Sequence, residues 1–178
     1  INKKLCDLKF KNNTWKSDHL NKLTNYYRKA PFFNVIFPVI ENLYEYSSEF
    51  AVDFIIHTMQ YAFDIFKINV IMQKSSEIKY EGNKGWLVLD LCKKTKTTSY
   101  LSGKGAENYM EQGILSAFSE AGIELKWHSF SHPIYQQQVK YPFVTGLSFL
   151  DCLFFLGIEK ANEMFWSNVN KGRNENNK

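Results

Sequence analysis

Residues 98–109 read TSYLSGKGAENY, and this stretch decides the fold of the chain. A β-type run from Thr98 to Leu101 ends in Ser-Gly-Lys-Gly, and a helix-type run follows from Ala106. Two glycines at such a corner let the backbone turn tightly and come close to a ligand. The pattern therefore predicts a strand that turns into a helix at residues 102–105.

The same corner is a candidate anion site. Backbone amides at the start of the helix would point toward a bound anion, and Lys104 would add a mobile positive charge. The spacing matches neither a Walker A loop nor a dinucleotide-binding fingerprint. A plain strand–turn–helix corner with a solvated lysine is the alternative, because short glycine motifs alone do not separate the two.

Outward from this corner, β-type and helix-type runs alternate. A β-type run at 69–73 precedes a helix at 82–94, and the run at 97–101 precedes a helix at 106–121. A third β-type run follows at 123–127. The alternation predicts parallel βαβ units, whose ligands bind outside the carboxyl ends of the strands.

The N-terminal half is predicted to be helical. Apolar residues at helical spacing mark helices at 15–29, 32–46 and 47–67, with Pro38 inside the second, and a short strand is predicted at 3–9. The fold class is therefore α/β, with a helical N-terminal half packed on a small, mostly parallel sheet with βαβ units.

The domain organisation is predicted from length and composition. A chain of 178 residues is long enough for one substantial core, so residues 1–167 are expected to form a single α/β domain. Residues 168–178 are polar and rich in asparagine, which predicts a disordered tail. The chain begins with Ile1 instead of methionine, which suggests the C-terminal part of a longer protein.

The composition of the chain argues against several classes of function. Apolar residues make up 44% of the chain, which favours a globular protein, and a net charge of +4 without a basic stripe argues against nucleic-acid binding. Cys6, Cys92 and Cys152 lack CxxC spacing, so reduced thiols in a cytoplasmic protein are expected. There is no signal peptide, and the longest apolar stretch, 143–158, is too short and too polar to span a membrane.

Two side chains are candidates for catalysis. Asp151 lies in an otherwise apolar helix, where a buried carboxylate is costly unless it is paired. It could hold a substrate amine or act as a base, or alternatively bond a backbone amide or a tyrosine. His132 follows the third β-type run and is a candidate general acid or base, with a solvated loop histidine as the alternative. No histidine pair has metal-ligand spacing with a third donor, so no metal is predicted.

Several neighbouring side chains are candidates for substrate binding. Tyrosine rings in this region would pack in a core by default, although their faces would also suit a sugar ring or a nucleotide base. Gln137 could bind a hydroxyl or amide through two hydrogen bonds. Ser148 is predicted to cap its helix in preference to acting as a nucleophile.

Three stretches in order resemble the WbqC-like protein family. The first is residues 100–109, the second is HPIYQQ at 132–137, and the third is FVTGLSFLDCLFFLG at 143–157. The helical half fits as well, so the resemblance covers about residues 1–165. The family's Gln-Pro-Asn-Tyr-Leu-Pro-Trp-like opening and its Asn-Arg-Asn-like segment do not occur in this chain. Gln136 and Phe155 also replace a common proline and a common asparagine.

The resemblance implies a bacterial protein of O-antigen, lipopolysaccharide or other surface-polysaccharide biosynthesis. It implies a transferase that moves glycine or another acyl group to an amino sugar. We expect the donor to be an activated sugar or an aminoacyl compound, and no cofactor is predicted. Partner enzymes of the same pathway are expected. A non-catalytic module that binds a nucleotide-sugar or assists assembly is the alternative.

These residues are predicted to form one site. A strand end, a helix start and a polar residue in an apolar helix tend to meet at one edge of an α/β sheet. Asp151 and His132 are the predicted catalytic residues. The predicted substrate-binding residues are Tyr100, Ser102, Gly103, Lys104, Gly105, Tyr109, Tyr135, Gln137 and Ser148.

Overall fold

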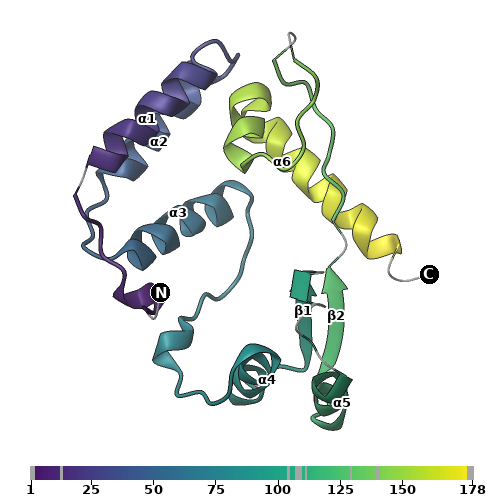
Figure 1. Ribbon diagram of the computed structural model, residues 1–178. Coiled ribbons are helices and arrows are strands. Elements are labelled where there is room, and N and C mark those ends of the chain that lie inside the picture. The colour runs from purple at the N-terminus through teal and green to yellow at the C-terminus, as the bar shows by residue number, and fades with distance from the viewer. Residues whose placement is uncertain are drawn as a thin grey trace. The chain divides into compact units, whose positions relative to one another are not determined.

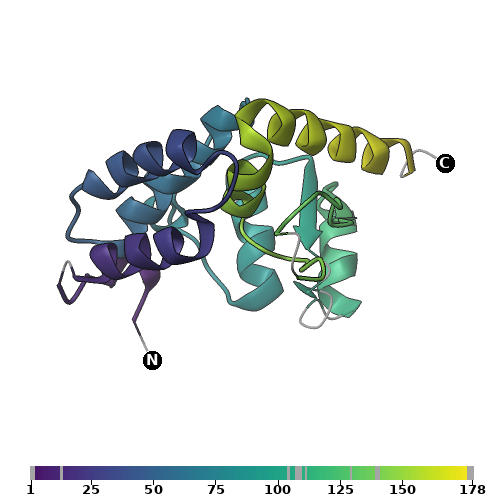
Figure 2. The same ribbon diagram turned by 90° about the horizontal axis from the view of Figure 1, so that it is seen from above.

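The computed structural model describes residues 3–12, 14–103, 105–106, 110, 112–128, 130–138 and 141–175, and this part of the chain is mostly helical (Figures 1 and 2). In chain order its elements are the 3₁₀ turn η1 (Leu5–Asp7), α1 (Thr14–Tyr27), α2 (Phe33–Glu45), α3 (Ala51–Ile65), the 3₁₀ turn η2 (Ser75–Glu77), α4 (Lys84–Lys94), β1 (Ser99–Gly103), α5 (Gln112–Glu120), β2 (Glu124–His128) and α6 (Phe149–Glu175).

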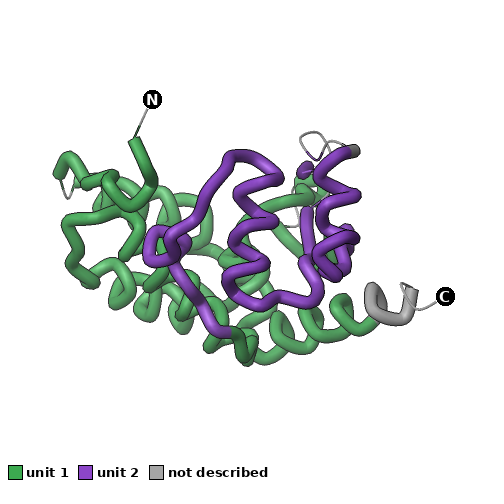
Figure 3. Tube along the Cα trace, turned by 90° about the horizontal axis from the view of Figure 1, so that it is seen from below, with its two compact units in different colours: residues 1–70, 132–178 green, residues 71–131 purple. Residues whose placement is uncertain are grey.

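The chain divides into two compact units (Figure 3). Unit 1 comprises residues 1–70 and 132–178, and unit 2 comprises residues 71–131. Unit 2 is therefore continuous in sequence, whereas unit 1 is assembled from two separate segments. The single domain predicted over residues 1–167 spans both units.

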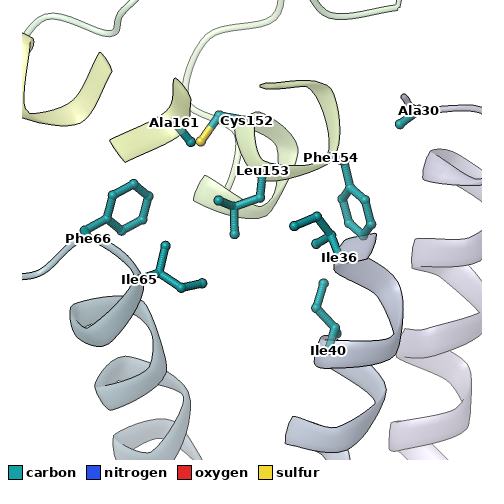
Figure 4. Close-up of a cluster of buried hydrophobic side chains, with 9 residues drawn as sticks. All are labelled: Ala30, Ile36, Ile40, Ile65, Phe66, Cys152, Leu153, Phe154 and Ala161. Carbon is teal, nitrogen blue, oxygen red and sulfur yellow. The ribbon is translucent and has the colours of Figure 1, made fainter. Parts of the chain in front are cut away.

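The core of unit 1 joins α2, the end of α3 and α6 (Figure 4). Ile36 and Ile40 are four residues apart and so share one face of α2, and both are almost completely buried. Leu153 and Phe154 of α6 are each 0% exposed. Phe154 also stacks on Tyr27 from the end of α1, with ring centroids 4.4 Å apart. Apolar spacing along three helices therefore builds this core.

A kink at Gly157 divides α6 into two helical parts. Gly157 has φ 76° and ψ 171°, a conformation outside the helical region. The carbonyl of Phe154, three residues before the kink, accepts the backbone N–H of Phe32 at 3.1 Å. Beyond the kink, the side chains of Asn162 and Trp166 donate to the carbonyls of Ile65 and Phe66 at 2.6 and 2.8 Å. Both parts of α6 are thus hydrogen-bonded to the N-terminal segment of unit 1.

Unit 2 contains a parallel pair of strands. β1 pairs with β2 from Ser99 opposite Glu124 to Gly103 opposite His128, and α5 lies between the two strands in the sequence. Phe118 of α5 is 1% exposed and stacks on Tyr100 of β1 at 5.8 Å. Its buried neighbours include Leu89 and Cys92 of α4. The α/β class and the parallel arrangement of these two strands are confirmed.

Four local expectations differ from the structure. The helix expected at 106–121 directly after the corner at 102–105 begins only at Gln112. Residues 69–73 form no strand, and Ile71 is 98% exposed, because a short apolar run needs a hydrogen-bonding neighbour to become one. The strand expected at 3–9 is the turn η1, followed by a single bridge between Lys9 and Phe50. The backbone of residues 168–175, expected as disordered tail, continues α6. In the described part of the chain, no helix is long and apolar enough to cross a membrane.

Candidate functional site

Asp151 is the centre of the candidate site. It is the third residue of α6 and only 3% exposed. Its backbone N–H donates to the carbonyl of Ser148 at 2.9 Å, and the Ser148 hydroxyl accepts the N–H of Leu150 at 3.3 Å. Ser148 lies just before α6 and accepts two hydrogen bonds from the backbone of its first turn. A negative charge in the first turn of a helix is favoured by the helix dipole.

Two side chains of the loop that precedes α6 donate to the Asp151 carboxylate. The Tyr135 hydroxyl lies 2.6 Å from Oδ2, and Nε2 of Gln137 lies 3.0 Å from the same oxygen. The Tyr135 ring packs edge-on against Phe143 at 5.5 Å. The second and third family-like stretches of the sequence therefore meet at one buried carboxylate.

Tyr27 is a further neighbour of Asp151 that the sequence did not identify as a site residue. Burial raises the pKa of its hydroxyl, and Asp151 raises it further through its charge and a side-chain hydrogen bond. No periodic pattern links residues on α1 to residues on α6. The stacking of Tyr27 on Phe154 in the folded core is what brings the hydroxyl to the carboxylate.

The electrostatics around Asp151 keep its neighbours protonated. Burial raises the pKa of Tyr135, and the hydrogen bond to Asp151 raises it further. Burial, followed by the charge of Asp151, raises the pKa of Cys152 to about 11. Protonated hydroxyls can donate hydrogen bonds to a carboxylate. Asp151 therefore fixes the positions of the side chains that donate to it.

His132 lies on the same loop and is exposed. A Cβ atom placed on Gly146 would lie 3.9 Å from Nε2 of His132, so the imidazole approaches the backbone of the segment that leads into α6. Unlike Asp151, this side chain is accessible to a substrate proton.

The other predicted binding residues belong to unit 2. Ser102 is 2% exposed, and its hydroxyl has no hydrogen-bond partner among the residues that the structure describes. Gly103 and Gly105 have open space where a Cβ atom would stand. Lys104 and Tyr109 lie outside the described residues. The cleft predicted to join this corner with Tyr135, Gln137 and Asp151 remains a prediction, since the two sets belong to different units.

The described residues contain no group of three His, Cys, Asp or Glu side chains placed to hold a metal ion. The candidate site is built instead from one carboxylate, phenolic hydroxyls, a carboxamide and an imidazole. Such groups can orient a substrate and move a proton.

Comparison with known proteins gives the identity of the family. No curated protein and no solved structure matches the chain. The model of one family, described as the WbqC-like protein family, matches residues 1–163 of the 178. This range includes all of unit 2 and the site residues of unit 1 described above. The chain therefore belongs to the WbqC-like protein family.

Proposed function

We propose that this protein is a transferase of bacterial surface-polysaccharide synthesis that moves glycine or another acyl group from an activated donor to an amino sugar. Membership of the WbqC-like family fits a polysaccharide-associated protein. The nature of the transfer, the donor and the acceptor are inferred from the chemistry of the candidate site and from the family resemblance.

One observation carries the proposal: Tyr135 and Gln137 converge on the buried carboxylate of Asp151. Buried charged networks contribute little net stability compared with well-packed apolar side chains. A hydrogen-bonded carboxylate in an apolar helix, with titrating neighbours shifted away from their ordinary pKa, is typical of a functional site.

Each set of predicted site residues has its own role in the proposed transfer. The amides of residues 102–105 and Lys104 hold a phosphate or carboxylate of the donor, because backbone N–H groups and a positive charge at the carboxyl end of a strand favour an anion. Asp151 fixes Tyr135 and orients the neutral acceptor amine. His132 accepts a proton from that amine, whose lone pair then bonds to the acyl carbon while the leaving group departs with its electron pair.

A non-catalytic binding or assembly module is the second candidate function. The observation that favours it is that Tyr135 and Gln137, two side chains of one loop, both donate to Asp151 of α6. A network of side-chain hydrogen bonds also suits a rigid recognition surface.

Calorimetry with a panel of nucleotide-sugars and aminoacyl donors, followed by mass spectrometry of the products, tests the proposal. Lys104→Ala should weaken donor binding by about 1–2 kcal/mol, whereas Lys93→Ala, on the exposed end of α4, should not. His132→Ala should bind the donor and lose turnover. Binding without turnover would favour the binding module, and the absence of any binding would contradict the transferase and the anion site in favour of the assembly module.

A further inference from the structure

Gln137 uses all of its side-chain hydrogen-bonding groups on the protein itself. Its Oε1 accepts the backbone N–H of Val144 at 2.9 Å, and its Nε2 donates to the Val144 carbonyl at 3.0 Å. The same nitrogen donates to Oδ2 of Asp151 at 3.0 Å. A carboxamide has one acceptor oxygen and two N–H groups, so no donor is left over for a substrate.

We propose that Gln137 is a positioning residue, which clasps the backbone of Val144 and fixes this part of the loop that precedes α6 to the carboxylate of Asp151. Tyr135 supplies a second attachment on the same oxygen. The clasp holds the loop whether or not the protein catalyses a transfer, so the inference goes beyond the proposed function.

The loop depends on this clasp because three of its described apolar side chains are largely exposed. Ile134 is 83% exposed, Tyr141 is 68% exposed and Val144 is 49% exposed. Segments with few buried apolar contacts open locally at low free energy unless other bonds hold them. A hydrogen bond to a charged group contributes about 1.5–3 kcal/mol, which is the scale that can hold such a loop closed.

The substitution Gln137→Glu tests the clasp with almost no change in shape. At pH 7 it removes both N–H donors and places a second carboxylate against Asp151 and the Val144 carbonyl. The loop should then open, and hydrogen exchange of the Val144 and Tyr141 amides should become at least tenfold less protected. Protection of the α2 and α6 amides should stay unchanged.

Acid should close the loop of this variant again. Two adjacent carboxyl groups share one proton more readily than they both ionise, so the carboxyl group introduced by Gln137→Glu can donate to Asp151 near pH 5. The other titratable groups that face Asp151 are Tyr27 from α1, Tyr135 from the loop and Cys152 on α6. Their pKa values are all raised, so none of them titrates between pH 5 and pH 7. Recovery in acid that Gln137→Glu shows and Gln137→Ala lacks therefore reports the carboxyl pair, because His132 on the same loop is present in both variants.

Two further variants complete the test. Gln138→Glu makes the same charge change beside the clasp, where the carboxamide donates to the Tyr26 carbonyl at 3.4 Å, and it should retain loop protection. Gln137→Ala should open the loop at both pH values. The proposal would be overturned if Gln137→Glu left amide protection unchanged or lowered it throughout unit 1. An equal loss of protection in Gln138→Glu would also overturn it. Exchange needs no donor or acceptor, so failure here is distinct from failure to detect transfer.

Discussion

Ser102 is a residue whose burial costs stability. Its hydroxyl is buried on β1 without a hydrogen-bond partner in the part of the chain that the structure describes. An unsatisfied buried polar group costs about 1–3 kcal/mol, and removing it can be neutral or stabilising. The role of Ser102 in substrate binding stays a prediction, made from its place at the carboxyl end of a strand.

Ser102→Ala should therefore leave the free energy of unfolding unchanged or raise it by up to about 1–2 kcal/mol, as measured by urea denaturation. Ser99→Ala, on the exposed start of the same strand, should change it by less than about 0.5 kcal/mol. A loss of more than about 1 kcal/mol in Ser102→Ala would show that the hydroxyl has a structural partner.

Residue-scale electrostatics also predict how stability depends on pH. The pKa values of Tyr27 and Tyr135 are raised by burial and by Asp151, and that of Cys152 is raised from 9.0 to about 11. The unfolded chain therefore releases these protons at lower pH than the folded chain does. The stabilisation is complete below about pH 9 and is lost as the pH rises through the raised values.

The midpoint of urea unfolding should consequently fall steadily from pH 9 upward. Tyr27→Phe should make the fall shallower, because one of the shifted groups is gone. Tyr26→Phe is the matched control, since that ring is 72% exposed, and it should follow the unmodified protein. The slope should not vanish in Tyr27→Phe, because burial also raises the pKa of Tyr44 and Tyr61. Equal slopes in both variants would contradict the assignment of Tyr27.

At the scale of elements, the kink in α6 depends on one glycine. The φ and ψ of Gly157 lie in a region that is essentially restricted to glycine. A Cβ atom at this position would stand 2.7 Å from Cε1 and 2.9 Å from Cδ1 of Phe32. Backbone conformation and close approach therefore both exclude a side chain.

Gly157→Ala should lower the free energy of unfolding by about 3 kcal/mol, since backbone strain and overpacking each cost about 1–3 kcal/mol. Gly113→Ala in α5 is the control, because a Cβ atom there meets nothing within 4 Å. That variant should gain up to about 1 kcal/mol from its better helix propensity. Chemical denaturation of the two variants distinguishes a position that requires glycine from one that accepts alanine.

Elements with a strong local signal were predictable from the sequence, and those that depend on a partner were not. The β-type runs around Tyr100 and Leu125 lie on two strands that pair. The run around Ile71 has similar composition and no neighbour to pair with among the described residues. For Asp151, a tyrosine partner was one of two readings of the sequence, and Tyr135 is such a partner. Tyr27 was missed because its approach to Asp151 depends on how the helices pack.

At the scale of the whole molecule, each unit has its own buried centre. Leu153 of α6 is 0% exposed in unit 1, and Phe118 of α5 is 1% exposed in unit 2. Separate clusters of buried residues surround the two side chains. Each unit should therefore respond to damage within its own core.

Leu153→Ala should cost about 2–5 kcal/mol and Phe118→Ala about 3–5 kcal/mol, because each leaves a cavity. Native-state hydrogen exchange should locate the losses. Leu153→Ala should lower the protection of amides in α2 and α6, and Phe118→Ala should lower it in α4, β1 and β2. Equal loss over both units in either variant would mean that the chain unfolds as one cooperative body.

The division of unit 1 into two sequence segments has a consequence for synthesis. A ribosome delivers residues 71–131 before it delivers α6, so every contact within unit 2 can form while the core of unit 1 is still incomplete. The bonds from Asn162 to Ile65 and from Trp166 to Phe66 close loops of 97 and 100 residues. Contacts at such separation are slow to form. Until α6 has been synthesised, the apolar faces of α2 and α3 stay exposed to solvent. Nascent chains that stop short of α6 should accordingly be the species that chaperones bind most strongly.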